Sequence, residues 1–100
     1  MIRFYDYDGN PTTRSHWIAL FDDTQARRLG FAVIGEVTIS TVWLGLDHSF
    51  GHGEEPVLWE TLVRKGEDEE EMYRYSSRDE ALARHDRLVA EYLLLVEATS

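Results

Sequence analysis

The sequence contains no cysteine, only two prolines and no long run of hydrophobic residues. The absence of cysteine excludes disulfides and thiolate metal sites, and it makes a reducing compartment such as the cytoplasm the expected setting. No apolar segment approaches the roughly 20 residues of a membrane-spanning helix, and residues 1–9 lack the basic and apolar segments of a signal peptide. We therefore expect no membrane partner. A chain of 100 residues suffices for one core but not for two, so we expect a single domain over residues 1–100.

Positive charge is also scarce. The sequence has ten Lys and Arg residues and nineteen Asp and Glu residues, which gives a net charge of −9, and thirteen of the acidic residues fall in residues 51–100. Binding to a phosphate backbone needs clustered Lys and Arg, so we expect no nucleic-acid partner. A basic protein surface or a cation fits this charge better.

Hydrophobic residues make up 43% of the chain, and their spacing predicts its first elements. Residues 2–7 predict a short aromatic strand that ends in a tight turn at Asp8-Gly9. A first helix is predicted over residues 14–29, with Thr13 as its N-cap and Gly30 in the left-handed position after its last turn.

The middle of the chain has the composition of a sheet. Its β-branched and aromatic residues predict strands over residues 31–34, 37–46, 57–64 and 72–75, with a hairpin loop at Gly35-Glu36 and a charged turn at 65–71. A loop over residues 47–56 separates the second and third of these strands, and we expect the strands to form a small antiparallel sheet.

The last helix gives the clearest pattern in the chain. Ser77 and Glu80 have the spacing of a capping box, and apolar residues then recur at helical spacing from Ala81 to Val96. His85 lies on this apolar stripe, where we expect it to be partly buried and hydrogen-bonded. The sequence therefore predicts an α+β fold, in which a small antiparallel sheet of three to five strands is packed by a C-terminal amphipathic helix and a shorter N-terminal helix.

Several short motifs add a family resemblance. The most specific is Trp-Leu-Gly-Leu-Asp-His at residues 43–48; the others are the turn at residues 5–11, Trp17, Glu60-Thr61, residues 73–76 and residues 81–85. In these motifs, over nearly its whole length, the chain resembles a group of small uncharacterised proteins from actinobacterial phages and prophages. The resemblance implies a phage or prophage origin and a site of action in the bacterial host cytoplasm. It implies no functional residue, because the group has no assigned activity.

One loop carries candidate metal ligands. Asp47, His48 and His52 offer a carboxylate and two imidazoles, which suit zinc or manganese. No His-Glu-x-x-His pair accompanies them, so the simpler interpretation is that Asp47 caps the end of a strand and His48 bonds the backbone. The alternative is a divalent-metal-binding protein or a metal-dependent enzyme that uses this loop.

The acidic residues are candidates for contact with a basic partner. They are Glu54 and Glu55 before the third predicted strand, and the run that includes Glu69, Glu70 and Glu71. A solvated rim is the commoner role for such a run, and imitation of a nucleic acid would need acidic residues on more elements than these.

The end of the last helix is apolar on nearly every side. Tyr92, Leu93 and Leu94 exceed what one sheet face needs, and exposed apolar patches often mark interfaces. A homodimer through this helix is the simplest explanation, with an isologous contact by symmetry.

No catalytic set is recognisable, and we expect neither an enzyme nor a cofactor. Our prediction is a small, acidic, non-enzymatic protein of phage type that acts by binding a host or phage protein in the cytoplasm.

Overall fold

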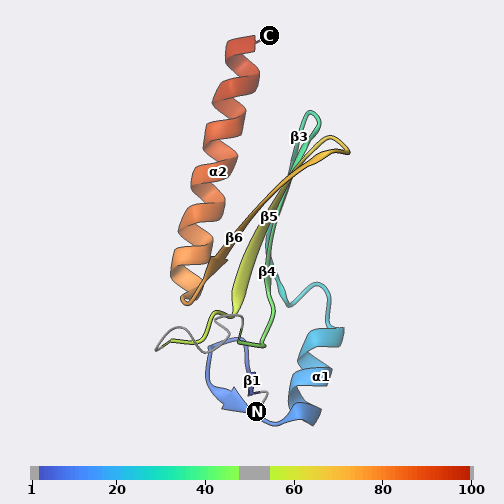
Figure 1. The fold of residues 1–100 in the computed structure, drawn as a ribbon, viewed down its shortest axis with the longest axis vertical. Helices are drawn as coiled ribbons and strands as arrows, with labels where there is room; N and C mark the ends of the chain where they lie inside the picture. The colour runs from blue at the N-terminus through green and yellow to red at the C-terminus, as the bar shows by residue number, and fades with distance from the viewer. Residues whose placement is uncertain (1–2, 48–54, 100) are drawn as a thin grey trace.

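The computed structural model describes residues 3–47 and 55–99. It confirms the predicted α+β class: a four-stranded antiparallel sheet in the order β3-β4-β5-β6, a two-stranded sheet of β1 and β2, and two helices. The elements are β1 (Phe4–Tyr5), β2 (Pro11–Thr12), α1 (Arg14–Asp22), β3 (Arg28–Ile34), β4 (Val37–Trp43), β5 (Trp59–Lys65), β6 (Glu69–Tyr75) and α2 (Arg78–Thr99). Figure 1 shows α2 running along one face of the larger sheet, with α1 and the small sheet at its lower end.

The N-terminal turn forms as predicted, although its strands are shorter. Asp6 organises it, because its Oδ1 accepts hydrogen bonds from the backbone N–H groups of Asp8 and Asn10. Gly9 has a φ of +85°, a left-handed conformation that glycine adopts without strain.

The prediction of a first helix over residues 14–29 is wrong in its second half. Thr13 is the N-cap as predicted, and its hydroxyl accepts from His16 N–H, but α1 ends at Asp22. The Asp23 carboxylate accepts from the N–H of Ala26 and holds a turn, a competition with the helix that is typical of aspartate. Gly30 consequently lies inside β3 instead of ending a helix.

The sheet is a meander of four strands with seven residues each. The predicted Gly35-Glu36 loop joins β3 to β4, and Gly35 has a φ of +60°. The prediction that residues 65–71 form only a turn is wrong, because Glu69, Glu70 and Glu71 belong to β6 and pair with the end of β5. Cross-strand pairing with basic residues of β5 stabilises this acidic segment as a strand.

α2 buries one face of the sheet. Ser77 caps it as predicted, with its hydroxyl accepting from Glu80 N–H at 3.3 Å. Two hydrophobic clusters lie beneath the helix: one contains Tyr5, Trp43, Leu58, Trp59, Tyr75 and Ala81, and the other contains Ile34, Ile39, Val63 and Leu88. The opposite face of the sheet carries Phe31, Val33 and Met72, which are half or more exposed.

The predicted stripe on α2 is buried only as far as the sheet reaches. Ala81, His85 and Leu88 are buried, whereas Leu95 and Val96 are exposed. The upper end of α2 and the hairpin tips diverge in Figure 1, so the last two turns have no sheet beneath them.

Candidate functional site

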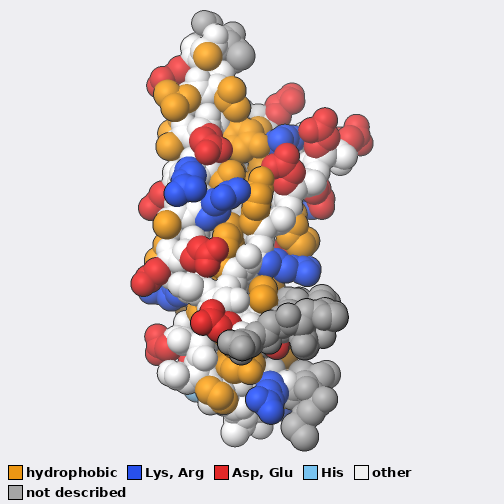
Figure 2. Space-filling model, turned by 60° about the vertical axis from the view of Figure 1, so that its left-hand side comes forward, with side chains coloured by type: hydrophobic (Ala, Val, Ile, Leu, Met, Phe, Trp, Pro, Cys, Tyr) orange, Lys and Arg blue, Asp and Glu red, His pale blue; other side chains and the backbone are white. Residues whose placement is uncertain are grey.

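The C-terminal end of α2 presents an apolar surface. The exposed fraction is 48% for Leu93 and 65% for Leu94, and Leu95 and Val96 are exposed as well. In the view of Figure 2, hydrophobic side chains lie along this end of the helix beside acidic ones. We call residues 93–96 the helix-end patch. Exposure of consecutive apolar residues on a helix is typical of a surface that another molecule covers.

The acidic strand β6 is linked to Tyr92, the residue that precedes this patch. Lys65 connects the two, because its Nζ donates to Glu71 Oε1 at 2.9 Å and also lies 5.5 Å from the ring centroid of Tyr92. Hydrogen bonding with Tyr92, and then with Glu71, raises the pKa of Lys65. The structure thus links Glu71 through Lys65 to Tyr92, a connection between β6 and α2 that the sequence does not show.

Part of this negative charge is compensated within the sheet. Arg64 donates through two nitrogens to Glu70 Oε1, at 3.1 and 2.9 Å. Glu71 accepts from Lys65 and from the Tyr73 hydroxyl, and these bonds lower the pKa of its carboxyl. Glu69 carries no ion pair within the described residues, so it contributes more net charge than its two neighbours.

The other predicted acidic residues lie elsewhere. Glu55 precedes β5 at the end where Trp59 pairs with Tyr75, whereas Glu69 pairs with Lys65 at the far end of the same strand. Glu55 therefore does not join the acidic residues of β6. Glu54 lies outside the described residues.

The predicted metal loop is only partly described. His48 and His52 lie outside the described residues. Asp47 Oδ1 accepts from Val57 N–H at 2.9 Å, so its carboxylate holds the two ends of the loop together. Within the ranges 3–47 and 55–99 there is no group of three His, Asp or Glu side chains that could hold a metal ion.

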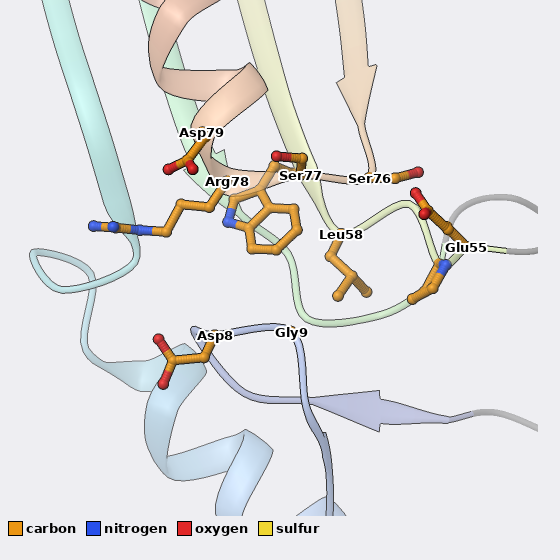
Figure 3. Close-up of a pocket in the computed structure, with 10 residues that line it drawn as sticks. Asp8, Gly9, Glu55, Leu58, Ser76, Ser77, Arg78 and Asp79 are labelled. Carbon is orange, nitrogen blue, oxygen red and sulfur yellow. The ribbon is translucent and has the colours of Figure 1, made fainter.

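A pocket of about 410 Å³, which no sequence pattern predicted, lies between the N-terminal turn and the start of α2. Asp8 and Gly9 form one side, and Ser77, Arg78 and Asp79 form the other, as Figure 3 shows. Among the described residues, its lining mixes carboxylates with a single guanidinium and has no nucleophile beyond serine hydroxyls. The only sequence signals at this place are the Asp-Gly turn and the Ser77 cap, and both are explained by backbone geometry alone.

A buried polar chain separates the two hydrophobic clusters. The Tyr75 hydroxyl donates to Thr61 at 3.0 Å, Thr61 and Thr41 share a hydrogen bond of 2.6 Å, and Thr41 lies 2.7 Å from His85 Nδ1. If each hydroxyl donates once in this direction, Nδ1 accepts and the imidazole is neutral. Burial lowers the pKa of His85, against a smaller opposing effect of Asp86. These hydrogen-bonded side chains lie beneath α2, where they specify how the helix packs and offer no access to a substrate.

The most specific sequence motif also has a structural role. Gly45 has a φ of +71°, and a Cβ atom there would overlap the indoles of Trp17 and Trp43. Trp17 Nε1 donates to Leu44 O, and Trp43 Nε1 donates to Asp6 O. The N-terminal turn, Trp17 and the Trp-Leu-Gly-Leu string therefore form one packed unit.

No helix within the described residues is long and apolar enough to cross a membrane. No protein-family model, no curated protein and no solved structure matches the chain.

Proposed function

We propose that this chain is a non-enzymatic interaction protein of phage type, which binds a host or phage protein through the helix-end patch. One observation carries the proposal: Leu93 and Leu94 are about half or more exposed on a helix that continues beyond its own sheet. A projecting apolar helix end is suited to insertion into a hydrophobic groove, one of the recurring modes of peptide recognition.

The charge around the patch limits the chemistry of the partner. Glu69, Glu70 and Glu71 lie on the strand that Lys65 links to Tyr92, and the whole chain carries a net charge of −9. A groove with an apolar floor and a rim of Lys or Arg complements this arrangement, because rim charges steer encounter and exclude wrong partners. The same charge disfavours nucleic acid and anionic membranes.

The test is site-specific photo-crosslinking in a bacterial lysate. A photoreactive residue at position 94 should capture a defined protein, whereas the same residue at Arg87 should not. Arg87 is a matched control because it is exposed and lies about two turns earlier on the same side of α2.

Competition makes this test specific. An excess of unlabelled wild-type protein should abolish the crosslink, and an excess of Leu94→Asp protein should not. With the captured partner purified, Leu94→Asp should weaken its binding about tenfold or more, which corresponds to about 1.4 kcal/mol. Equal capture at positions 94 and 87, or no capture at either, would contradict the proposal.

A further inference from the structure

The two edges of the four-stranded sheet differ in charge. The outer strand β6 carries Glu69, Glu70, Glu71 and Arg74, whereas the outer strand β3 carries only Arg28, at its first position. Charged side chains are the usual protection of an edge strand against pairing with another chain. β3 therefore lacks this protection by charge from Leu29 to Ile34, and its one register irregularity lies between Arg28 and Gly30.

The backbone N–H and C=O groups that face outward from this edge belong to Phe31 and Val33. Ile34 and Val37 close a two-residue hairpin loop and so form a hydrogen-bonded pair. Because such pairs alternate along the ladder, the N–H and C=O groups of Phe31 and Val33 point away from β4. Their side chains are 50% and 63% exposed, and in the described part of the chain no hydrogen bond outside the β3–β4 ladder uses their backbone.

The flank of α2 that faces the β3 edge of the sheet is apolar. The guanidinium carbon of Arg84 lies 4.7 Å from the ring centroid of Tyr73, a residue of β6. The flank of α2 that carries Arg84 therefore lies over β6. Leu82, Val89 and Leu93 are about 140–180° around the helix from Arg84, so their flank lies toward β3. His85 confirms this orientation, because its ring packs on Gly30 of β3.

We propose that the chain forms a symmetric homodimer, in which β3 pairs antiparallel with β3 of a second copy. The two-fold axis passes beside Ala32, so Phe31 of each copy lies opposite Val33 of the other. The outward backbone groups of both residues then form hydrogen bonds across the seam. The two four-stranded sheets become one sheet of eight strands, and the exposed aromatic–β-branched pairs stabilise the seam.

Charge complementarity selects this register over its neighbours. Arg28 precedes the register irregularity at the start of β3, and Glu36 lies in the hairpin loop at its other end, so each end of the antiparallel seam brings Arg28 of one copy near Glu36 of the other. Both side chains are exposed in the single chain. Shifting the seam by two residues would lose both ion pairs and move Phe31 or Val33 out of the apolar pairing.

The helices meet on the same side of the extended sheet. Ala32 and Val89 pack against the same cluster of Ile34, Ile39, Val63 and Leu88, so Val89 lies near the level of the two-fold axis. Val89 of the two copies then approach each other, and Leu82 and Leu93 extend the contact along the two antiparallel helices. This contact covers Leu93, which is one residue of the helix-end patch, and leaves Leu94 exposed, so a partner can still bind at position 94 of the dimer.

An engineered disulfide tests the seam directly, since the chain has no cysteine of its own. Ala32→Cys places two thiols at a non-hydrogen-bonded pair, where Cα atoms are about 4.5 Å apart and a disulfide fits. Under oxidising conditions at micromolar concentration most of this variant should become a covalent dimer. Leu94→Cys is the matched control and should stay a monomer on the same gel. A disulfide at position 94 and none at position 32 would assign the dimer to the helix end and overturn the proposal.

A charge exchange tests the register without cysteine. Arg28→Glu and Glu36→Arg each place like charges opposite each other, and each should raise the dimer dissociation constant about fivefold or more in sedimentation experiments. Mixing the two variants should restore tight association as a heterodimer, because each seam end again joins opposite charges. Wild-type protein that sediments as a monomer, or variants whose mixture associates no better than either alone, would overturn the proposal.

Discussion

The imidazole of His85 lies directly on the backbone of Gly30. A Cβ atom built on Gly30 would come within 2.5 Å of His85 Nε2, a separation that real Cβ atoms do not show. The contact fixes the height of α2 over β3. It also positions Nδ1 of the same ring against Thr41, which connects the helix to the polar chain in the core.

Gly30→Ala should destabilise the protein by about 1–3 kcal/mol, because the added methyl group overpacks the contact with His85. The measurement is urea unfolding followed by circular dichroism. Gly30→Ala in a His85→Ala background should cost much less, since the smaller side chain leaves room for the methyl group. Additive effects of the two substitutions would show that the ring does not restrict position 30.

Acidification should destabilise the fold through His85. Burial lowers its pKa in the folded state below the ordinary 6.5, so beneath pH 6.5 the unfolded chain takes up a proton that the folded chain resists. The free energy of unfolding should therefore fall as the pH drops from 6.5 toward the folded pKa, and it should not change from this source above 6.5.

The comparison for this pH effect is His85→Gln, which has no titrating ring. Its stability should be lower than that of the wild type but flatter between neutral pH and about pH 5.5, where carboxylates remain ionised. Identical slopes for the two proteins would remove His85 as the source.

Thr41→Val should cost about 1–3 kcal/mol, because it leaves His85 Nδ1 and the Thr61 hydroxyl without their shared partner in a buried site. Thr38→Val is the matched control: it lies on the same strand but on the opposite face, which α2 does not cover. Chemical denaturation of both variants gives their free energies of unfolding. Thr38→Val measures the effect of the threonine-to-valine change alone, and Thr41→Val adds the loss of the buried hydrogen bonds. Equal losses of stability would contradict the role of Thr41 in the polar chain.

Gly45→Ala should be among the most damaging single substitutions. It adds the strain of a positive φ to an overlap with Trp17 and Trp43. We expect a loss of near-ultraviolet circular dichroism from the two indoles and a melting temperature lower by several degrees, about 4–8 °C for each kcal/mol in a domain of this size. Gly35→Ala has a similar φ but meets no neighbouring atom, so it should cost clearly less.

Asp47→Ala should lower stability by about 0.5–1.5 kcal/mol, because Val57 N–H loses its acceptor. Asp47→Asn retains an oxygen and should cost less. Neither zinc, manganese nor a chelator should change the wild-type melting temperature if the carboxylate only closes the loop. A rise with either metal that is lost in Asp47→Asn would instead support the metal-binding alternative.

Local patterns predicted the elements whose cause is local. The β-branched run of residues 37–43, the Gly35-Glu36 loop and the Ser77 cap each depend on neighbouring residues, and each forms as expected. His85 could likewise be placed in the core from its position on the helical stripe.

The errors concern segments whose conformation depends on distant partners. Glu69–Glu71 has low β-propensity and reads as a turn, but Arg64 and Lys65 lie across the sheet and pair with it. Residues 23–29 continue a helical pattern, yet the Asp23 turn and pairing of Arg28 with Val42 make the segment a turn and the start of a strand. Neither partner is visible in a window of sequence.

The sequence by itself determined that the chain is acidic and free of cysteine, and that an amphipathic C-terminal helix covers an antiparallel sheet. It also indicated that this helix carries surplus apolar residues. Only the tertiary structure decided where that surplus lies, since strand length and register set how far the sheet extends beneath α2. The structure likewise decided which edge of the sheet lacks charge and which helix flank lies beside it. Surfaces of this kind are built from residues far apart in the chain, so they exist only once the backbone has folded.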